Sequence, residues 1–376
     1  MSEFSIRSLA IHRFKSIRRL NHLPLEAINI LIGANGAGKS NFVSFFAFMS
    51  ELVNRRLQSY IAELGGAKRI LSAGCHPSEC FATIVGFECG SLIFIAAQTD
   101  DDRLQLVYEK FVPADQDAQA VLASLVEQYR HANGAPESRL RNMTAAEGLL
   151  SPEENAALAA IAQWRVYHFH DASSDAGVKR YCMLSDNGIL HGDASNLAAV
   201  LYRLREKESD YYEFIRSTIM LVVPYFEDFV LVPREMPGSE EPHILLKWQQ
   251  RGMSTPYLSN QFSDGTIRFI CLATALLQPN PPETMLFDEP ELGLHPSAVE
   301  LLASMIRATS EKTQILVSTQ SPSLLNRFVP ENILVVEQTE GNSTFRRLDR
   351  EEIGSWLDEY SLGQLWEKNI LGGRPQ

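Results

Sequence analysis

Residues 33–40 read Gly-Ala-Asn-Gly-Ala-Gly-Lys-Ser, in which two glycines separated by four residues precede a lysine and a hydroxyl residue. This is the pattern of a phosphate-binding loop. Four apolar residues within 28–32 predict a short buried strand before the loop, and apolar residues recur at helical spacing over 42–53. The glycines let the backbone aim its N–H groups at phosphate oxygens, and the positive end of the following helix strengthens that field. The stretch therefore predicts a strand, a phosphate-binding turn and a helix, the beginning of an α/β fold.

The loop also predicts its ligands, ATP and Mg²⁺. Lys39 would bind the β- and γ-phosphates, and the hydroxyl of Ser40 would contact Mg²⁺. The alternative is a fortuitous glycine turn, but the flanking strand and helix argue against it. The predicted nucleotide-binding residues are Asn35, Gly36, Ala37, Gly38, Lys39, Ser40 and Asn41.

A second buried strand is expected at residues 285–287, and it ends in the acidic pair Asp288-Glu289. A strand with this ending, well downstream of a phosphate loop, is typical of the second nucleotide-binding motif. Asp288 would act on the Mg²⁺ shell, and Glu289 would polarise the attacking water. A solvated acidic turn is the alternative interpretation, which the upstream loop makes less favourable.

Two further polar segments adjoin a predicted apolar helix and a predicted buried strand. Ser263 and Asp264 precede an apolar helix expected at 267–277, where Ser263 is a good N-cap and Asp264 complements the helix dipole. Residues 318–322 read Ser-Thr-Gln-Ser-Pro and follow a strand expected at 314–317, so Gln320 should project from the end of that strand. Alone, the first segment indicates only a well-capped helix.

Taken in order, the four motifs resemble those of ABC-type ATPase heads, whose relatives include RecF, the structural-maintenance-of-chromosomes proteins and the overcoming-lysogenization-defect ATPases. The chain is more closely similar to bacterial AAA_21-type predicted ATPases over residues 263–279, 288–296 and 362–375. The resemblance covers nearly the whole chain, least clearly a central helical segment. It implies an α/β fold, an ABC-type P-loop ATPase head with an antiparallel β lobe and a helical insertion.

The same resemblance implies a homodimer in which two heads sandwich two ATP molecules. Ser263, Asp264 and Gly265 would then form a signature segment that reaches the γ-phosphate held by the partner subunit. Glu289 and Gln320 would be the catalytic residues, with Gln320 at a position where many such heads have His. A Gln amide still donates a hydrogen bond to a phosphate oxygen, but it cannot carry a proton near neutral pH.

Three segments are expected along the 376 residues: the first part of the head at 1–112, a surface-exposed helical insertion at 113–163, and the second part of the head at 164–376. Strand patterns at 81–88, 92–98 and 104–110 predict the antiparallel lobe, and residues 21–26 are expected to form a turn. In the third segment, His168 and His170 share one face of a strand expected at 164–170, and Asp171 follows. A metal site and a merely polar strand end both remain open there.

The net charge and the cysteine content indicate which cellular compartment and which binding partners are compatible with the chain. The net charge of −12 argues against nucleic-acid binding over the whole surface, but not against a local basic stripe. The densest basic cluster is expected to contact DNA or to be a solvated strand end; it consists of Arg13, Lys15, Arg18 and Arg19. Five cysteines without a C-x-x-C pair indicate a reducing cytoplasm, and no apolar run approaches the roughly 18 residues that a membrane helix requires.

The sequence leaves two functions open. The first is an ATP-hydrolysing dimeric switch coupled to DNA or to a separately encoded effector such as a nuclease, in DNA repair or phage defence. The second is an ATP-binding regulatory or scaffolding module with little turnover. A small-substrate kinase is disfavoured, because the Ser263 segment would have no role in a monomeric kinase.

Overall fold

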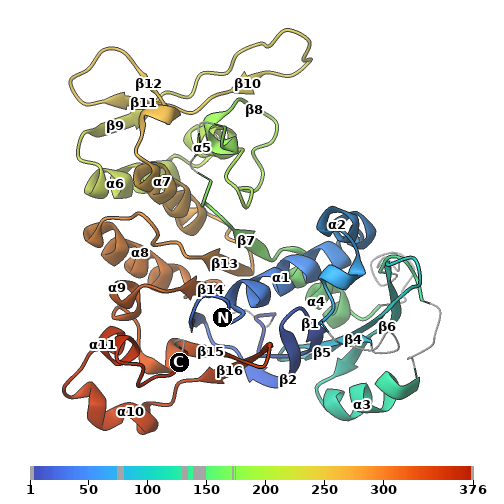
Figure 1. The fold of residues 1–376 in the computed structure, drawn as a ribbon. Helices are drawn as coiled ribbons and strands as arrows, with labels where there is room; N and C mark the ends of the chain where they lie inside the picture. The colour runs from blue at the N-terminus through green and yellow to red at the C-terminus, as the bar shows by residue number, and fades with distance from the viewer. Residues whose placement is uncertain are drawn as a thin grey trace. The chain divides into compact units, whose positions relative to one another are not determined.

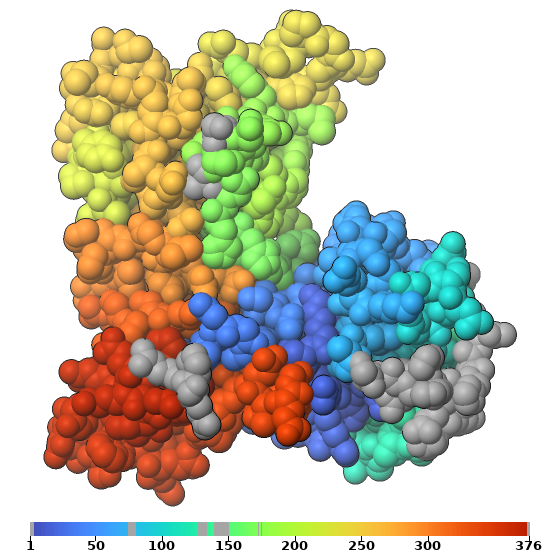
Figure 2. All heavy atoms as spheres, in the orientation of Figure 1, coloured from blue at the N-terminus to red at the C-terminus, as the bar shows by residue number. Residues whose placement is uncertain are grey.

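The computed structural model describes residues 4–73, 80–128, 134–138, 150–171, 173 and 175–373. The chain divides into two compact units (Figure 1). Unit 1 comprises Met1–Val166, Pro282–Leu286 and Ser310–Gln376, and unit 2 comprises Tyr167–Pro281 and Phe287–Thr309. In Figure 2, most of unit 2 appears in green, yellow and light orange, whereas unit 1 carries the blue, cyan and red parts of the scale.

A six-stranded sheet carries the phosphate loop, and its strand order is β16-β15-β3-β14-β13-β7. β14 and β15 flank β3 and run parallel to it, with Thr319 and Val335 both opposite Ile32. Parallel strands end at one edge of a sheet, so the loop after β3 and the segment after β14 leave the sheet at the same edge. The strands are β3 (Ile28–Ile32), β7 (Arg165–Tyr167), β13 (Thr284–Asp288), β14 (Gln314–Thr319), β15 (Ile333–Thr339) and β16 (Asn342–Arg347).

The predicted antiparallel lobe is confirmed as a five-stranded sheet of order β2-β1-β4-β5-β6. The expectation of a turn at 21–26 was wrong, because β2 continues to Pro24. A bulge hides this strand: Leu20 to Leu23 of β2 spans three steps opposite the two steps from Ile11 to Leu9, which breaks the alternation. The strands are β1 (Ser8–Phe14), β2 (Ile17–Pro24), β4 (Phe81–Gly86), β5 (Gly90–Gln98) and β6 (Leu104–Pro113).

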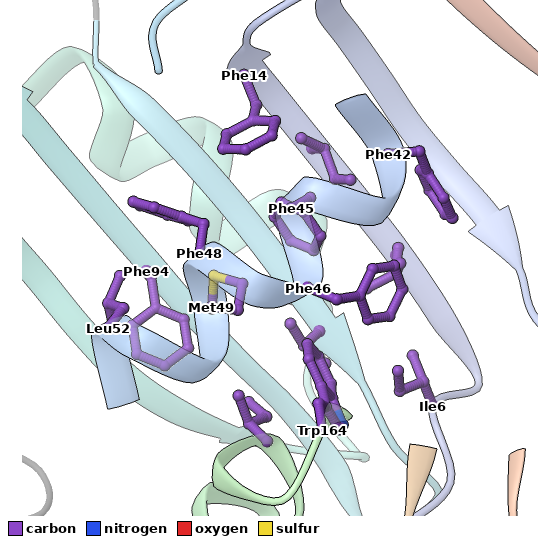
Figure 3. Packing of buried hydrophobic residues seen from close by; sticks show 14 of the residues in the cluster. Ile6, Phe14, Phe42, Phe45, Phe46, Phe48, Met49, Leu52, Phe94 and Trp164 are labelled. Carbon is purple, nitrogen blue, oxygen red and sulfur yellow. The ribbon is translucent and has the colours of Figure 1, made fainter. Parts of the chain in front are cut away.

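The main core of unit 1 forms around the aromatic face of α1. Phe45 packs edge-on against Phe14 with ring centroids 5.6 Å apart, and Phe46 lies 5.0 Å from Trp164 (Figure 3). Such aromatic pairs contribute about 0.5–1.5 kcal/mol each beyond their buried area, so they hold the helix that follows the loop firmly. The helices of unit 1 are α1 (Lys39–Val53), α2 (Leu57–Leu64), α3 (Ala118–Gln128), α4 (Pro152–Ala162), α9 (Pro322–Leu325), α10 (Arg350–Leu357) and α11 (Leu362–Glu367).

The sequence predicted that the segment 113–163 is exposed on the surface, but the structure buries part of it. α4 belongs to the main core, with Ala157, Leu158 and Ile161 buried. Its small residues let it approach α1 closely, and Asn54, the C-cap of α1, donates a hydrogen bond to the carbonyl of Ala162. α3 packs on the antiparallel sheet in a separate apolar cluster. Residues 129–133 and 139–149 of this segment lie outside the described residues, and its assignment as an insertion stays a prediction.

Unit 2 is built around α7, which is buried on nearly every side from Thr266 to Leu277. A helix that is apolar all round belongs in a protein interior, and α5, α6 and α8 pack against it. Short strands form two small sheets of order β12-β11-β9 and β10-β8. The elements are α5 (Leu197–Lys207), α6 (Ser209–Val222), α7 (Asp264–Leu277), α8 (Pro296–Thr309), β8 (Cys182–Met183), β9 (Phe226–Phe229), β10 (His243–Ile244), β11 (Lys247–Gln250) and β12 (Tyr257–Leu258).

Among the described residues, no helix is both long enough and apolar enough to cross a membrane.

Candidate functional site

The phosphate-loop segment has the backbone that its glycines predict. Gly36 and Gly38 have φ angles of 81° and 112°, a region that favours glycine. Gly38 is the N-cap of α1, and no side chain of the described residues caps the first turn. The first N–H groups of a helix lack partners within the helix, and together with the helix dipole they form a binding site for anions.

Two serines that the sequence did not predict, Ser16 and Ser343, stabilise the loop by hydrogen bonds. The hydroxyl of Ser343, on β16, donates a hydrogen bond of 2.6 Å to the carbonyl of Ala37 and lies 2.7 Å from the hydroxyl of Ser16. The amide of Asn41 donates to the same Ser16 hydroxyl over 2.7 Å. A Cβ at Gly38 would collide with Ser343, so a side chain at this position would displace the support.

Lys39 lies inside the turn and is 5% exposed. Its ammonium group donates hydrogen bonds to the carbonyls of Gly33 (2.7 Å) and Ala34 (3.1 Å). A buried charge requires such partners, and they fix the ammonium group within the curve of the loop. Asn35, Gly36 and Ser40 are exposed, so the outer side of the loop is open to a ligand.

Gln320 follows β14 directly and is partly buried. Its neighbour Thr319 is aligned with Ile32, the last residue of β3, so Gln320 and the phosphate loop lie at the same sheet edge. The chain then turns at once, because the hydroxyl of Thr319 accepts a hydrogen bond from the Ser321 N–H and Ser321 caps α9. Gln320 therefore lies at the end of β14, at the sheet edge where the phosphate loop also leaves the sheet, and its role at a γ-phosphate stays a prediction.

The acidic pair belongs to unit 2. Asp288 is the last residue of β13, and its side chain is 14% exposed. Glu289 has a φ angle of 43° and precedes Pro290. A left-handed conformation is uncommon for a residue with a side chain and costs on the order of 1–3 kcal/mol, and such strain is concentrated at functional sites. This strain marks Glu289 as a functional candidate independently of the motif.

The signature segment opens α7 as expected. The Ser263 hydroxyl accepts a hydrogen bond from the Thr266 N–H over 3.2 Å, so it is the N-cap. Asp264 lies 3.8 Å from the ammonium group of Lys179. Gly265 packs directly against the carbonyl of Gly293, in the loop that follows Glu289, and a Cβ there would collide with that carbonyl.

Arg268 connects three segments of unit 2, and the sequence analysis did not identify it. Its guanidinium group donates to the carbonyls of Phe169 (2.8 Å), His170 (3.3 Å) and Leu292. It therefore joins the segment after β7 and the loop after Glu289 to the signature helix. The signal in the sequence was a charged residue within an otherwise apolar helix, since such a residue must find polar partners when it is buried.

His168 and His170 lie beside the acidic pair. Nδ1 of His168 is 3.9 Å from Oδ2 of Asp288, and the two imidazole rings are 6.2 Å apart. Burial lowers the pKa of His168, and the Asp288 carboxylate partly offsets this effect. A ligand atom from each of His168, His170 and Asp288 falls within 4.8 Å of the others. The structure thus brings the two histidines of the metal site that the sequence left open together with Asp288, which the sequence had not grouped with them.

Mg²⁺ prefers oxygen ligands, and the Ser40 hydroxyl and the Asp288 carboxylate are of that type. Ser40 is exposed at the start of α1 in unit 1, and Asp288 ends β13 in unit 2. The residue types at both predicted positions therefore fit the ion that accompanies ATP.

Comparison with known proteins agrees with this fold. Residues 146–326 match the family model described as "AAA domain, putative AbiEii toxin, Type IV TA system". The matched range contains the signature segment, the acidic pair and Gln320. No curated protein matches the sequence.

Solved heads of structural-maintenance-of-chromosomes (Smc) proteins share the fold along almost the whole chain. An Smc head bound to the C-winged helix domain of ScpA is 15% identical, with a TM-score of 0.55, covering 93% of this chain and 99% of that chain. An Smc head with an extended coiled coil, bound to the C-terminal domain of ScpA from Pyrococcus furiosus, is 15% identical, with a TM-score of 0.53 and coverage of 94% and 99%.

A third structure, an Smc head with a coiled coil and joint from Pyrococcus yayanosii, is 12% identical, with a TM-score of 0.52 and coverage of 94% and 99%. At these identities the likeness concerns the fold alone. The family match over residues 146–326 and the shared fold confirm the predicted resemblance: the chain is similar to AAA_21-type ATPases over that range and has the fold of Smc ATPase heads.

Proposed function

We propose that this protein binds and hydrolyses ATP as a dimeric switch, in which two copies close around two nucleotides and the closed state acts on DNA or on a separately encoded effector. The geometry of the phosphate loop carries the proposal. Lys39 is fixed inside a turn with glycines at φ 81° and 112°, directly before a helix whose first turn has no side-chain cap among the described residues. This combination of a fixed cation and the positive end of a helix dipole is suited to a polyphosphate.

Each further residue has a role that follows from its chemistry. The ammonium group of Lys39 would attract the β- and γ-phosphates, and the amide of Gln320 would donate to a γ-phosphate oxygen. Glu289 would accept the proton of the attacking water. The Ser263 hydroxyl and the N-terminus of α7 would face the γ-phosphate bound by the partner copy. Mg²⁺, with Ser40 and Asp288 as its ligands, would supply charge neutralisation of the phosphates.

Calorimetry with ATP and Mg²⁺ tests the assignment. Lys39→Ala should weaken ATP binding at least tenfold, because it removes the cation from the loop. Lys312→Ala is the matched control, since Lys312 is exposed in unit 1 beyond the end of α8. Equal ATP affinity in the wild type and in Lys39→Ala would contradict the assignment of this loop as the ATP-binding site. Binding without measurable hydrolysis would instead favour the scaffolding module.

A basic groove in unit 1 supports nucleic acid as one partner. The groove has a volume of about 760 Å³. Its lining residues come from the β1–β2 hairpin (His12, Arg13, Arg18, Arg19, Asn21 and His22) and from α3 and the residue before it (Asp117, Gln119, Ala120, Leu122, Ala123 and Val126). Arginines of this kind bind phosphate groups readily, and the groove offers three of them on one hairpin.

Lys15 is not part of this groove, although the sequence grouped it with the three arginines. Its ammonium group donates a hydrogen bond of 2.8 Å to the hydroxyl of Ser44 on α1, and burial lowers its pKa. The left-handed backbone at Arg13 and Lys15 turns the chain between the two strands. The basic contact that we propose therefore consists of Arg13, Arg18 and Arg19.

A further inference from the structure

Unit 2 contains a cluster of three metal-ligating side chains: His168, His170 and Asp288. Each offers one ligand atom within 4.8 Å of the other two. The two histidines directly follow β7, and Asp288 ends β13, which is the neighbour of β7 in the sheet order. Side chains that leave two neighbouring strand ends are brought together by the sheet itself, without a special loop.

The alternation of the strand places both histidines on one face. Tyr167 and Phe169 are buried, so the intervening His168 and the following His170 point the other way. Tyr167 stacks on Phe287, with ring centroids 5.1 Å apart and an interplanar angle of 17°. Phe287 precedes Asp288, so this stacked pair fixes the register between the two histidines and the carboxylate.

Hydrogen bonds hold the backbone of the cluster. The His168 N–H donates to the carbonyl of Gly192 over 2.8 Å. The carbonyls of Phe169 and His170 both accept from the buried guanidinium group of Arg268. These hydrogen bonds fix the backbone that carries the two histidines. Ion binding therefore costs less conformational entropy than it would on a mobile segment.

The ligand types differ from those that Mg²⁺ prefers. Two imidazole nitrogens and one carboxylate oxygen are a usual set for Zn²⁺ and related transition-metal ions, which often keep a fourth position for water. Ligands about 2.1 Å from a tetrahedral ion are roughly 3.4 Å apart. Nδ1 of His168 and Oδ2 of Asp288 are 3.9 Å apart, so this pair must close by about 0.5 Å, and no pair of the three ligand atoms is more than 4.8 Å apart. The His168 side chain is 49% exposed, which gives an ion access.

We propose that His168, His170 and Asp288 form a binding site for a transition-metal dication of the Zn²⁺ class. A second consequence rests on the proposed function: an ion bound here occupies the carboxylate of Asp288, so it opposes the role of Asp288 in ATP hydrolysis. The site then makes the ATPase head sensitive to such metals.

Co²⁺ titration of the full-length protein without nucleotide tests the site. Wild type should bind one equivalent and develop visible absorption bands of nitrogen- and oxygen-bound Co²⁺, without the near-ultraviolet charge-transfer band of cysteine ligation. Zn²⁺ should displace the Co²⁺. His168→Ala and His170→Ala should each weaken binding at least tenfold.

His191→Ala is the matched control for this titration. His191 also lies in unit 2, its side chain is 46% exposed, and its Nε2 is 3.2 Å from Oδ1 of Asp186, but it faces a single carboxylate. The control should bind Co²⁺ like the wild type. Equal binding by the wild type, His168→Ala and His170→Ala overturns the proposal, as does loss of binding in His191→Ala alone. Circular dichroism confirms that each variant is folded, and the exposed position of His168 makes it the safer of the two substitutions.

The inhibitory consequence is measured separately. Zn²⁺ should inhibit ATP hydrolysis at saturating Mg²⁺ and ATP, and His170→Ala should require at least tenfold more Zn²⁺ for the same fractional inhibition. Equal sensitivity of the two proteins refutes the inhibitory role even if Co²⁺ binds. If the wild type hydrolyses no ATP, the proposed function fails, whereas the Co²⁺ spectra still decide whether the metal site exists.

Discussion

Glu289 combines a strained backbone with a predicted catalytic role. A φ angle of 43° before a proline is unfavourable for glutamate, and glycine would adopt it more easily. The neighbouring Pro290 and the contact between Gly265 and the loop at Gly293 restrict how this strain is relieved. The strained residue is thus held by its surroundings, which is what positioning of a general base requires.

We therefore expect Glu289→Gln to keep ATP bound while hydrolysis falls by roughly 10²–10⁴, because the amide cannot accept the proton of the water. The amide has the same shape, so the melting temperature should not change. Single-turnover hydrolysis and size-exclusion chromatography with ATP would measure the loss of rate and the accumulation of the closed dimer. Glu300→Gln, on the exposed side of α8, is the control. Hydrolysis at the wild-type rate in Glu289→Gln would rule out the residue as the base.

Gln320 sets a different expectation, because its side chain does not titrate near neutral pH. Gln320→Ala should weaken ATP-dependent dimerisation by about 1.5–3 kcal/mol per site, the value of a hydrogen bond to a charged group. Gln320→His should retain dimerisation and add a titration near pH 6.5 to the rate profile, where the wild type has none from this position. If Gln320→Ala dimerises and hydrolyses ATP like the wild type, the residue only stabilises the strand end.

At the residue scale, the sequence predicted positions whose signal is local. The loop, Ser263 and the acidic pair stand within short patterns that dictate their own backbone. Ser343 and Ser16 could not be predicted, because they meet the loop from β16 and from the β1–β2 turn, far away in the chain. Arg268 was visible as a charge in an apolar helix, but its three carbonyl partners depend on tertiary packing.

The β1–β2 hairpin and α3 form an element-scale feature, the basic groove. Arg18→Gln combined with Arg19→Gln should reduce the slope of log affinity against log salt for duplex DNA by about 1.8, at 0.9 for each lost phosphate contact. Fluorescence anisotropy over a salt series would measure it. Lys15→Gln is the control on the same hairpin, because Lys15 contacts Ser44 and does not line the groove. An unchanged slope in the double variant would leave the arginines as a solvated strand end.

Elements were predicted well where the pattern was regular and poorly where packing overrode it. β4, β5 and β6 of the antiparallel lobe are short runs of apolar, β-branched and aromatic residues, and they were found. β2 was not found, because its buried residues Ile17, Leu20 and Leu23 recur at a spacing of three, and the bulge accounts for the step from Leu20 to Leu23. α4 was assigned to the surface together with the rest of residues 113–163, yet its alanines are small enough to bury against α1. Which face of such a helix is covered depends on its neighbour and not on its own sequence.

On the scale of the whole molecule, the proposed dimer gives Ser263 two roles, one in its own chain and one toward the partner copy. Within the chain, its hydroxyl caps α7. Ser263→Asp keeps a capping oxygen but places a negative charge where the partner's γ-phosphate should lie. Ser263→Thr keeps both the cap and the hydroxyl and is the matched control.

We expect Ser263→Asp and Lys39→Ala chains to be inactive alone and to regain about one working site per mixed dimer when combined. The regained site pairs the intact Lys39 of one copy with the intact Ser263 of the other. ATP hydrolysis by co-purified chains, with differential scanning fluorimetry as the folding control, measures the effect. Absence of any regained activity, with both chains folded and co-purifying, would argue against sharing in trans.

The placement of β3 between β14 and β15 also determines when the nucleotide loop becomes structured during synthesis. β3 ends directly before the phosphate loop, but both of its strand partners begin after residue 313. On the ribosome, the phosphate loop must therefore wait until residues 314–339 have emerged, on the order of 15–60 s after its own synthesis. Until then, the aromatic residues of α1 can pack only against the antiparallel lobe, α2, α4 and Trp164. A nascent chain consequently acquires its nucleotide loop late, together with Gln320, and partial chains that lack β14 and β15 are not expected to bind ATP.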